Sequence, residues 1–401
     1  MKSESILPLA MVVLLAVSAS AGTYSGGDGE PNNPYRIETP ADLNEIGSHP
    51  DDFNDCFILV NDINMAGFLY DTAPVAPDTS SSAGFQGTAF TGIFDGNDHI
   101  ISNLTIDTAG ADKDYLGLFG QIGESGQVKN VCIEDVNIIG GHDSSFLGGL
   151  VGGNYYGTIS HCYSKGSVSG GDASWDLGGL AGYNYDGSIS NCYSKGQVSG
   201  GYSSWALGGL VGSNGSDGGT ISRCYSTVQV QGEDYSEALG GLVGGNGGII
   251  TNCYSSGRVQ GGNNSEHIGG LAGLNDDGTF ISCYSNGQVS GDDYLGGLVG
   301  HDNMFGSYTT CFWDTDVNPD VNGIGNATDP NVIGESTTNM KRESTFTDSG
   351  WDFIEIWNIG ENQTYPYLKV YPAGDLNHDG RVDFFDFAIA ASHWLEGVED
   401  D

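Results

Sequence analysis

A run of oxygen-bearing residues near the C-terminus has the spacing of a calcium-binding loop. The twelve residues 375–386 read DLNHDGRVDFFD. In an EF-hand loop, side-chain oxygens come from positions 1, 3, 5, 9 and 12, a backbone carbonyl comes from position 7, and a glycine at position 6 makes the sharp turn. Gly380 stands at position 6 here. The predicted ligands are therefore Asp375, Asn377, Asp379, the carbonyl of Arg381, Asp383 and Asp386.

The last ligand position of this loop is an aspartate. Asp386 replaces the bidentate glutamate of intracellular sensors, so we expect weaker binding that suits extracellular calcium. The alternative is an acidic loop that is merely solvated. Apolar residues continue beyond the loop at helical spacing and form one face, which must dock on a neighbouring segment or a partner protein. These residues are Phe384, Phe387, Ala388, Ala391, Trp394 and Leu395.

The middle of the chain repeats a glycine-rich phrase, Leu-Gly-Gly-Leu followed by Val or Ala and then Gly. Its central leucines recur in steps of 27 to 32 residues. Such a near-fixed period is typical of stacked repeats, in which each unit buries its apolar face against its neighbours. The copies are Leu147–Gly152, Leu177–Gly182, Leu207–Gly212, Leu239–Gly244, Ile268–Gly273 and Leu295–Gly300, preceded by a divergent copy at Leu116–Gly120.

Each repeat predicts three short strands, with glycine where the chain must turn tightly. No repeat contains ten residues with helical periodicity. The sequence therefore predicts an all-β fold, a parallel β-helix with three strands in each coil of about 30 residues. The β-helix is expected to be right-handed, because crossover connections between parallel strands are right-handed. Irregular caps and a small EF-hand-like loop with a helix complete the predicted architecture.

Three kinds of side chain recur in step with the repeat and predict ladders along the stack. Asparagines predict buried amide ladders, and cysteines predict a row of free thiols, with disulfides as the alternative. The aromatic residue after each cysteine predicts an outward row that either stacks on itself or stacks on sugar rings. The rows are Asn154, Asn184, Asn214, Asn246 and Asn275; Cys162, Cys192, Cys224, Cys253, Cys283 and Cys311; and Tyr163, Tyr193, Tyr225, Tyr254, Tyr284 and Phe312.

One spacing conflicts with simple strand alternation. An apolar residue lies three positions before each cysteine, as Ile159 does before Cys162, so both can face inward only if a bulge or corner separates them. Elsewhere the sequence predicts a helix near Ala41–Ser48, capped by Thr39. It also predicts strands at Phe57–Val60 and His99–Ile106, and an aromatic cluster at Trp351–Val370 that seals the open end of the stack.

Composition restricts the class of partner and the compartment. The 401 residues include 66 Gly and 20 Tyr, and 12 Lys+Arg against 52 Asp+Glu give a net charge of −40. Nucleic-acid binding is not expected, because such proteins need basic residues to displace phosphate counterions. Residues 1–21 predict a secretory signal, with Lys2, an apolar stretch Ile6–Val17 and a cleavage site at Ala21. No segment is expected to span a membrane.

The predicted organisation has five parts. They are a signal peptide at 1–21, an N-terminal cap with the first irregular coils at 22–114, the repeat β-helix at 115–316, a C-terminal cap at 317–372 and a calcium module at 373–397.

Two segments resemble known families. The repeated phrase resembles the bacterial GLUG motif family, which implies a secreted or surface protein and carries no recognised catalytic residues. The tail resembles one repeat of a type I dockerin, with Asp375, Asn377, Asp379, Asp383 and Asp386 at the matching calcium positions. A full dockerin has two such repeats, and Phe384 and Phe385 replace the small polar residues of that family. The resemblance implies calcium binding and, as a possible partner, a cohesin-like protein.

The residues favour a non-catalytic scaffold or adhesion protein that contacts polysaccharide or the cell envelope. One alternative is a polysaccharide lyase or glycosidase; a glycosidase would need two opposed carboxyl groups. The other alternative is a purely structural matrix protein. No catalytic residue is predicted. The acidic residues of the repeats, Asp176 among them, are expected in loops, and His142, His161, His267 and His301 are expected to be single surface histidines.

Overall fold

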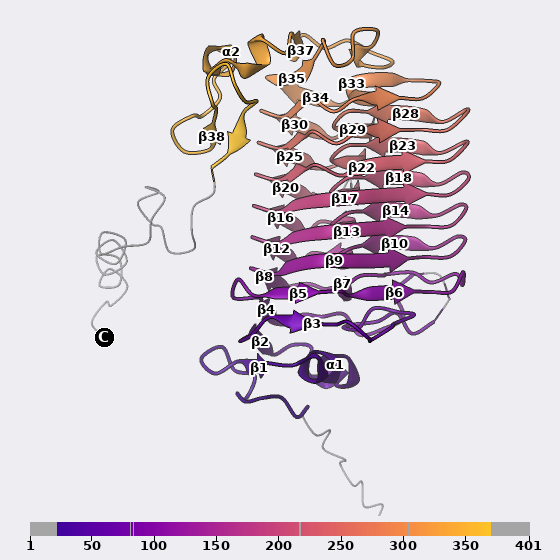
Figure 1. The fold of residues 1–401 in the computed structure, drawn as a ribbon, viewed down its shortest axis with the longest axis vertical. Helices are drawn as coiled ribbons and strands as arrows, with labels where there is room; N and C mark the ends of the chain where they lie inside the picture. The colour runs from indigo at the N-terminus through magenta and orange to yellow at the C-terminus, as the bar shows by residue number, and fades with distance from the viewer. Residues whose placement is uncertain (1–21, 81, 83, 216–217, 304, 370–401) are drawn as a thin grey trace, which may run out of the picture.

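The computed structural model describes residues 22–369, except 81, 83, 216, 217 and 304. The predicted signal peptide and calcium module therefore lie outside the described residues. Within the described part, the chain forms an all-β parallel solenoid of about eight turns with two α-helices, which confirms the predicted fold class (Figure 1). The helices are α1 (Pro40–Ser48) and α2 (Glu343–Thr347), and two 3-10 turns lie at Pro50–Asp52 and Asn339–Lys341.

Three parallel sheets run along the stack, and each coil between residues 119 and 314 contributes to all three. The isoleucine sheet contains the apolar residue that precedes each cysteine by three positions. Its ten strands are β1 (Tyr35–Ile37), β2 (Cys56–Leu59), β4 (Ile93–Asp95), β8 (Gln127–Lys129), β12 (Thr158–Ser160), β16 (Ser188–Ser190), β20 (Thr220–Ser222), β25 (Ile249–Thr251), β30 (Thr279–Ile281) and β34 (Ser307–Thr309).

The glycine sheet contains the repeated phrase, and most coils cross it with two short strands. Its thirteen strands are β7 (Phe119–Ile122), β10 (Ser145–Gly148), β11 (Val151–Tyr155), β14 (Trp175–Gly178), β15 (Ala181–Tyr185), β18 (Trp205–Gly208), β19 (Val211–Asn214), β23 (Glu237–Gly240), β24 (Val243–Asn246), β28 (Glu266–Gly269), β29 (Ala272–Asn275), β33 (Leu295–Asp302) and β36 (Asn322–Ile324).

The tyrosine sheet contains the aromatic row. Its fourteen strands are β3 (Ile63–Asn64), β5 (Ile100–Ser102), β6 (Thr105–Asp107), β9 (Cys132–Ile139), β13 (Tyr163–Ser169), β17 (Tyr193–Gly200), β21 (Tyr225–Ser226), β22 (Gln229–Gly232), β26 (Tyr254–Ser255), β27 (Val259–Gln260), β31 (Tyr284–Ser285), β32 (Val289–Ser290), β35 (Cys311–Asp314) and β37 (Val332–Glu335). A separate antiparallel pair joins β38 (Trp357–Asn358) and β39 (Tyr367–Leu368).

The three glycines of the phrase permit close approach, a role separate from the tight turns that the sequence predicts for glycine in each repeat. A Cβ on Gly240 would lie 1.8 Å from the carbonyl oxygen of Val243. One on Gly241 would lie 2.1 Å from Ser255 Oγ, and one on Gly244 would lie 2.4 Å from the backbone of Ala206. None of the three has a left-handed φ. Glycine is needed here because coils touch backbone to backbone.

The predicted corner before each cysteine is confirmed. Ile159 and Cys162 are both buried, and the chain reverses its alternation between them at His161, whose φ is 54°. The same left-handed corner recurs along the stack at Asn191, Arg223, Asn252, Ser282 and Thr310. Within this ladder of corners, asparagine occurs repeatedly because it tolerates that backbone region at low cost.

The cysteine row is a buried ladder of free thiols, as the favoured interpretation predicted. The thiols make weak hydrogen bonds to the backbone. The Sγ of Cys224 donates to the carbonyl oxygen of Ser222, two residues earlier, at 3.2 Å and accepts from the Cys192 N–H at 3.4 Å. Burial raises the pKa of the Cys224 thiol, so it is protonated at neutral pH. The row therefore acts as small apolar packing with weak hydrogen bonds.

The asparagine row is confirmed as a buried amide ladder. The Nδ2 of Asn184 donates to Oδ1 of Asn214 at 2.8 Å and to the carbonyl oxygen of Gly187 at 3.1 Å. These asparagines end extended strands and lack a left-handed φ, so the amide network and not turn geometry explains their recurrence. The ladder stops at Asn154, whose Oδ1 has no donor because Ile122 lies opposite it in the preceding coil.

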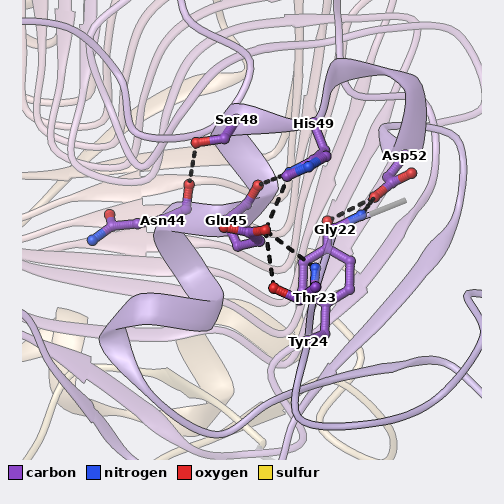
Figure 2. Close-up of polar contacts among 8 residues, drawn as sticks. All are labelled: Gly22, Thr23, Tyr24, Asn44, Glu45, Ser48, His49 and Asp52. Atoms are coloured by element: carbon purple, nitrogen blue, oxygen red, sulfur yellow. Dashed lines mark hydrogen bonds and ion pairs between the residues drawn. The ribbon is translucent and has the colours of Figure 1, made fainter. Parts of the chain in front are cut away.

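The N-terminal end of the stack is closed by α1. Thr39 and Asp42 form a capping box at its start, which confirms the predicted helix. Figure 2 shows how the first described residues are held on this helix and the turn after it. The Gly22 N–H and the Tyr24 hydroxyl both donate to Asp52 Oδ2, at 2.8 and 2.9 Å, and the Thr23 N–H donates to Glu45 Oε1 at 3.1 Å.

The predicted N-terminal strands are also present, with one break. The strand expected at Phe57–Val60 is β2. The strand expected at His99–Ile106 is divided into β5 and β6 by Asn103, which adopts a φ of 58°.

The C-terminal aromatic cluster packs beside the stack, whereas the sequence predicted that it would seal the end. It contains Tyr284, Phe312, Met340, Phe346, Trp351, Trp357 and Ile359. The Tyr284 hydroxyl donates to the Pro366 carbonyl at 2.5 Å, and Trp357 Nε1 donates to Asn252 Oδ1 at 3.3 Å. Strands β36 and β37 pair with the last coil instead, and β38 lies alongside the coils (Figure 1).

Candidate functional site

The aromatic row of the tyrosine sheet is a self-stacked ladder. Its consecutive rings from Tyr163 to Tyr284 are 4.8–5.0 Å apart with interplanar angles of 3–16°. The ring faces are thus occupied by neighbouring rings, and the C-terminal cluster covers the last of them. Of the two interpretations of this row, the structure supports the stabilising ladder.

A second aromatic row, on the outer face of the glycine sheet, borders a pocket. This tryptophan pocket has a volume of about 400 Å³ and is lined by Trp175, Ser203, Ser204, Trp205, Tyr235 and Glu237. The rings of Trp175 and Trp205 are 5.4 Å apart and tilted by 39°. About half of the Trp175 and Tyr235 surfaces is exposed, so one face of this row is open to a ligand.

The register of the glycine sheet positions this row. Ser145, Trp175, Trp205, Glu237 and Glu266 are paired from coil to coil, two residues before the first Leu or Ile of each phrase. We call this series the outer row. Because parallel pairing repeats the side-chain direction, its members project from one face of the sheet. The row changes from aromatic to acidic along the stack, while the buried positions beside it stay constant.

The residue after each outer-row residue forms a bulge. Phe146, Asp176, Ala206, Ala238 and His267 all have φ between 57° and 63°, and the pairing register skips them. A bulge reverses the strand alternation, so the next leucine still points into the core. Some bulged side chains meet residues of the neighbouring coil, as the Phe146 ring does Tyr183.

Asp176 is one such bulged residue, and the prediction that it lies in a loop is wrong. It belongs to β14 and is only 7% exposed. The Ser213 hydroxyl of the next coil donates to its carboxylate. Burial raises the pKa of Asp176 to about 7, and the serine hydrogen bond opposes that rise in part.

The acidic end of the outer row gathers two glutamates and a histidine. One ligand atom from each of Glu237, Glu266 and His267 lies within 4.8 Å of the other two. Burial raises the pKa of Glu237, and the neighbouring Glu266 adds to the effect. Burial also lowers the pKa of His267, as does His301, whose ring centre is 4.5 Å away.

The expectation of single surface histidines is therefore wrong for His267 and His301, whereas the side chain of His142 is exposed. His267 and His301 are in ring contact, and His142 Nδ1 lies 3.6 Å from Asp172 Oδ2. Sequence spacing did not reveal these contacts because they depend on coil-to-coil pairing. The outer row could have been found in the sequence, because its residues always lie two positions before the first Leu or Ile of the repeated phrase.

The six predicted calcium ligands cannot be compared with this site. Asp375, Asn377, Asp379, Arg381, Asp383 and Asp386 all lie outside the described residues, so the calcium loop stays a prediction.

Comparison with known proteins identifies GLUG motifs in part of the repeat array. The GLUG motif model matches residues 144–169, 173–199, 203–231 and 235–260, which confirms the predicted repeats in four copies. A stretch of 159 residues, 38% of the chain, is 33% identical to halomucin of Haloquadratum walsbyi. Another of 137 residues, 34% of the chain, is 32% identical to a candidate Gly-rich membrane protein of Evansella cellulosilytica. The chain spans 2% and 15% of these two proteins.

A solved structure supports the architecture. A candidate immunoglobulin A1 protease from Bacteroides ovatus superposes with a TM-score of 0.51 over 86% of this chain and 95% of that one, at 21% identity. At this identity the likeness concerns the fold alone. Within the described part of the chain, no helix combines the length and the apolar character that crossing a bilayer requires.

The raised pKa of Asp176 predicts a pH-dependent stability. Between about pH 4 and 7 the folded state holds this proton and the unfolded state does not, so the free energy of unfolding falls as pH rises. Asp176→Asn keeps a partner for Ser213 and removes the titration. Chemical denaturation should show that the free energy of unfolding of the variant, relative to that of wild type, rises by up to about 4 kcal/mol between pH 4 and 7.

Asp172→Asn is the control for this experiment, because Asp172 is exposed on the same face. The difference in free energy of unfolding between Asp172→Asn and wild type should change by less than about 0.5 kcal/mol over the same pH interval. Parallel pH curves for wild type and Asp176→Asn would contradict the assignment.

Proposed function

We propose that this protein is a secreted or surface-attached, non-catalytic scaffold or adhesion protein that binds extracellular polysaccharide or a cell-envelope component along the outer row. The observation that carries the proposal is the tryptophan pocket, where the rings of Trp175 and Trp205 lie 5.4 Å apart and about half of the Trp175 surface is exposed. Exposed aromatic rings in a shallow pocket are costly to leave in water and offer flat faces to a ligand. The surface or secreted location is supported by the names of the two relatives.

The charge of the surface favours neutral or amino-sugar ligands over acidic ones. Glu237 lines the tryptophan pocket, Glu266 follows it in the outer row, and the chain has a net charge of −40. An acidic polymer would be repelled by this field, whereas a protonated amino sugar would be attracted to the carboxylates and the ring faces.

The outer row is better suited to binding than to hydrolysis. Glu237 and Glu266 are in register on adjacent coils and project from the same face. Two carboxyl groups that act on a glycosidic bond flank that bond from opposite sides. The lyase or glycosidase alternative therefore finds no specific support in this arrangement.

A glycan-binding experiment tests the proposal. A panel of neutral, amino-sugar and uronic-acid polysaccharides is titrated against the full chain while tryptophan fluorescence is followed. We expect binding to a neutral or amino-sugar polymer. The double variant Trp175→Ala, Trp205→Ala should weaken it about thirtyfold, because each of the two aromatic contacts contributes about 1 kcal/mol. Tyr156→Ala, which removes an exposed ring elsewhere, is the control.

The outcomes separate the alternatives. Unchanged affinity in the tryptophan double variant would contradict the proposed site. Absence of binding to every polymer would contradict the binding role and leave a purely structural matrix protein. Release of reducing ends or unsaturated products would contradict the non-catalytic role.

We further propose that the tail is a calcium-binding module that orders the C-terminus or tethers it to a cohesin-like partner. The support is the EF-hand spacing of residues 375–386. Calcium should raise the stability of the tail and give a measurable heat on titration. The double variant Asp375→Ala, Asp379→Ala removes two carboxylate ligands and should abolish that heat.

The control for the calcium titration is Asp172→Ala, Asp234→Ala, which removes two carboxylates from the loops of the repeats. It should leave the calorimetric curve unchanged. An unchanged curve in the Asp375→Ala, Asp379→Ala variant would contradict the module.

A further inference from the structure

The acidic end of the outer row has the composition and spacing of a metal site. Glu237 on β23 and Glu266 on β28 are paired between adjacent coils. His267 follows Glu266 at the bulge, with a φ of 59°. The three side chains bring one ligand atom each to within 4.8 Å of one another. We call this group the Glu-Glu-His cluster.

In the part of the chain that the structure describes, one ring nitrogen of each of two histidines in this region is buried without a hydrogen-bond partner. The Nδ1 atoms of His267 and His301 are buried, and in the described part of the chain neither has a partner. A buried polar nitrogen without a partner is costly, so a native structure normally satisfies it with a protein group, water or an ion. The ring centres of His301 and His267 are 4.5 Å apart.

The charges of the cluster are also uncompensated. Among the described residues, no lysine or arginine forms an ion pair with Glu237 or Glu266. Burial raises the pKa of Glu237, and the neighbouring Glu266 carboxylate adds to that rise. A divalent cation placed between them would remove this repulsion.

We propose that the Glu-Glu-His cluster binds a divalent transition-metal ion. An imidazole nitrogen with carboxylate oxygens is a donor set that suits zinc, whereas calcium prefers oxygen donors alone. Three protein ligands leave at least one coordination position for water or a further ligand. Because Glu237 also lines the tryptophan pocket, the bound ion lies at the edge of that pocket.

Zinc titration of the full chain tests this proposal. The protein is stripped with chelator and saturated with calcium, so that the predicted tail loop is occupied, and Zn²⁺ is then titrated by calorimetry. We expect one zinc ion per chain. His267→Ala and the near-isosteric Glu266→Gln should each lower the affinity at least tenfold. Co²⁺ as a spectroscopic probe should give visible absorption in the wild type that His267→Ala weakens.

His142→Ala is the matched control, because His142 lies on the same side of the stack beside a single carboxylate, that of Asp172. It should bind Zn²⁺ with wild-type affinity. Thermal unfolding of each variant without metal shows whether the fold is kept. Absence of zinc binding by the wild type, or equal zinc affinity in folded His267→Ala, would overturn the proposal. Neither result depends on whether the tryptophan pocket binds a glycan.

Discussion

The close backbone contact between coils at the glycines of the repeated phrase is the constraint on which this structure depends. At Gly241 and its equivalents, a Cβ would strike both the serine of the tyrosine sheet and the next coil. The buried serines use this proximity: Ser194 Oγ donates to the Gly209 carbonyl at 2.7 Å. Removing the side chain thus permits both the stacking distance and the hydrogen bond that fixes it. Leucine and valine between the glycines supply the apolar core.

The same register has different consequences inside and outside the stack. Inside, parallel pairing places identical residues above one another, so asparagine and cysteine form continuous ladders that each coil extends. On the outside, the tyrosines also repeat from coil to coil, and their ring faces stack on one another. The outer row, in contrast, changes chemistry from coil to coil, from serine through tryptophan to glutamate, and so does the series of bulged residues beside it. Specific recognition requires such a departure from the repeat, because a uniform surface offers every ligand the same contacts at every coil.

Much of this fold could be predicted from the sequence, because the period of the phrase fixes how coils pair. The ladders of Asn184 and Cys192 follow from that period directly. The left-handed corner at His161 followed from a conflict in alternation, which only a reversal could resolve. The role of the phrase glycines could not be predicted, since tight turns and close contacts select the same residue.

The candidate site could be predicted less well, for a physical reason. The bulges at Asp176 and His267 move side chains across the surface without leaving a periodic apolar signal. Their partners, Ser213 and Glu237, lie on neighbouring coils at spacings set by loop length. The calcium loop, in contrast, is a local motif whose spacing alone carries the prediction. Local chemistry can therefore be inferred from one sequence, whereas chemistry assembled between coils needs the register.

The most direct measurement of the central claim compares alanine at two adjacent glycines of β24. A Cβ on Gly244 would meet the Ala206 backbone at 2.4 Å, whereas one on Gly245 would first meet Ser213 Oγ at 3.3 Å. Denaturant unfolding should show that Gly244→Ala lowers the free energy of unfolding by at least about 2 kcal/mol, and Gly245→Ala by less than about 1 kcal/mol. Equal losses in the two variants would contradict the account.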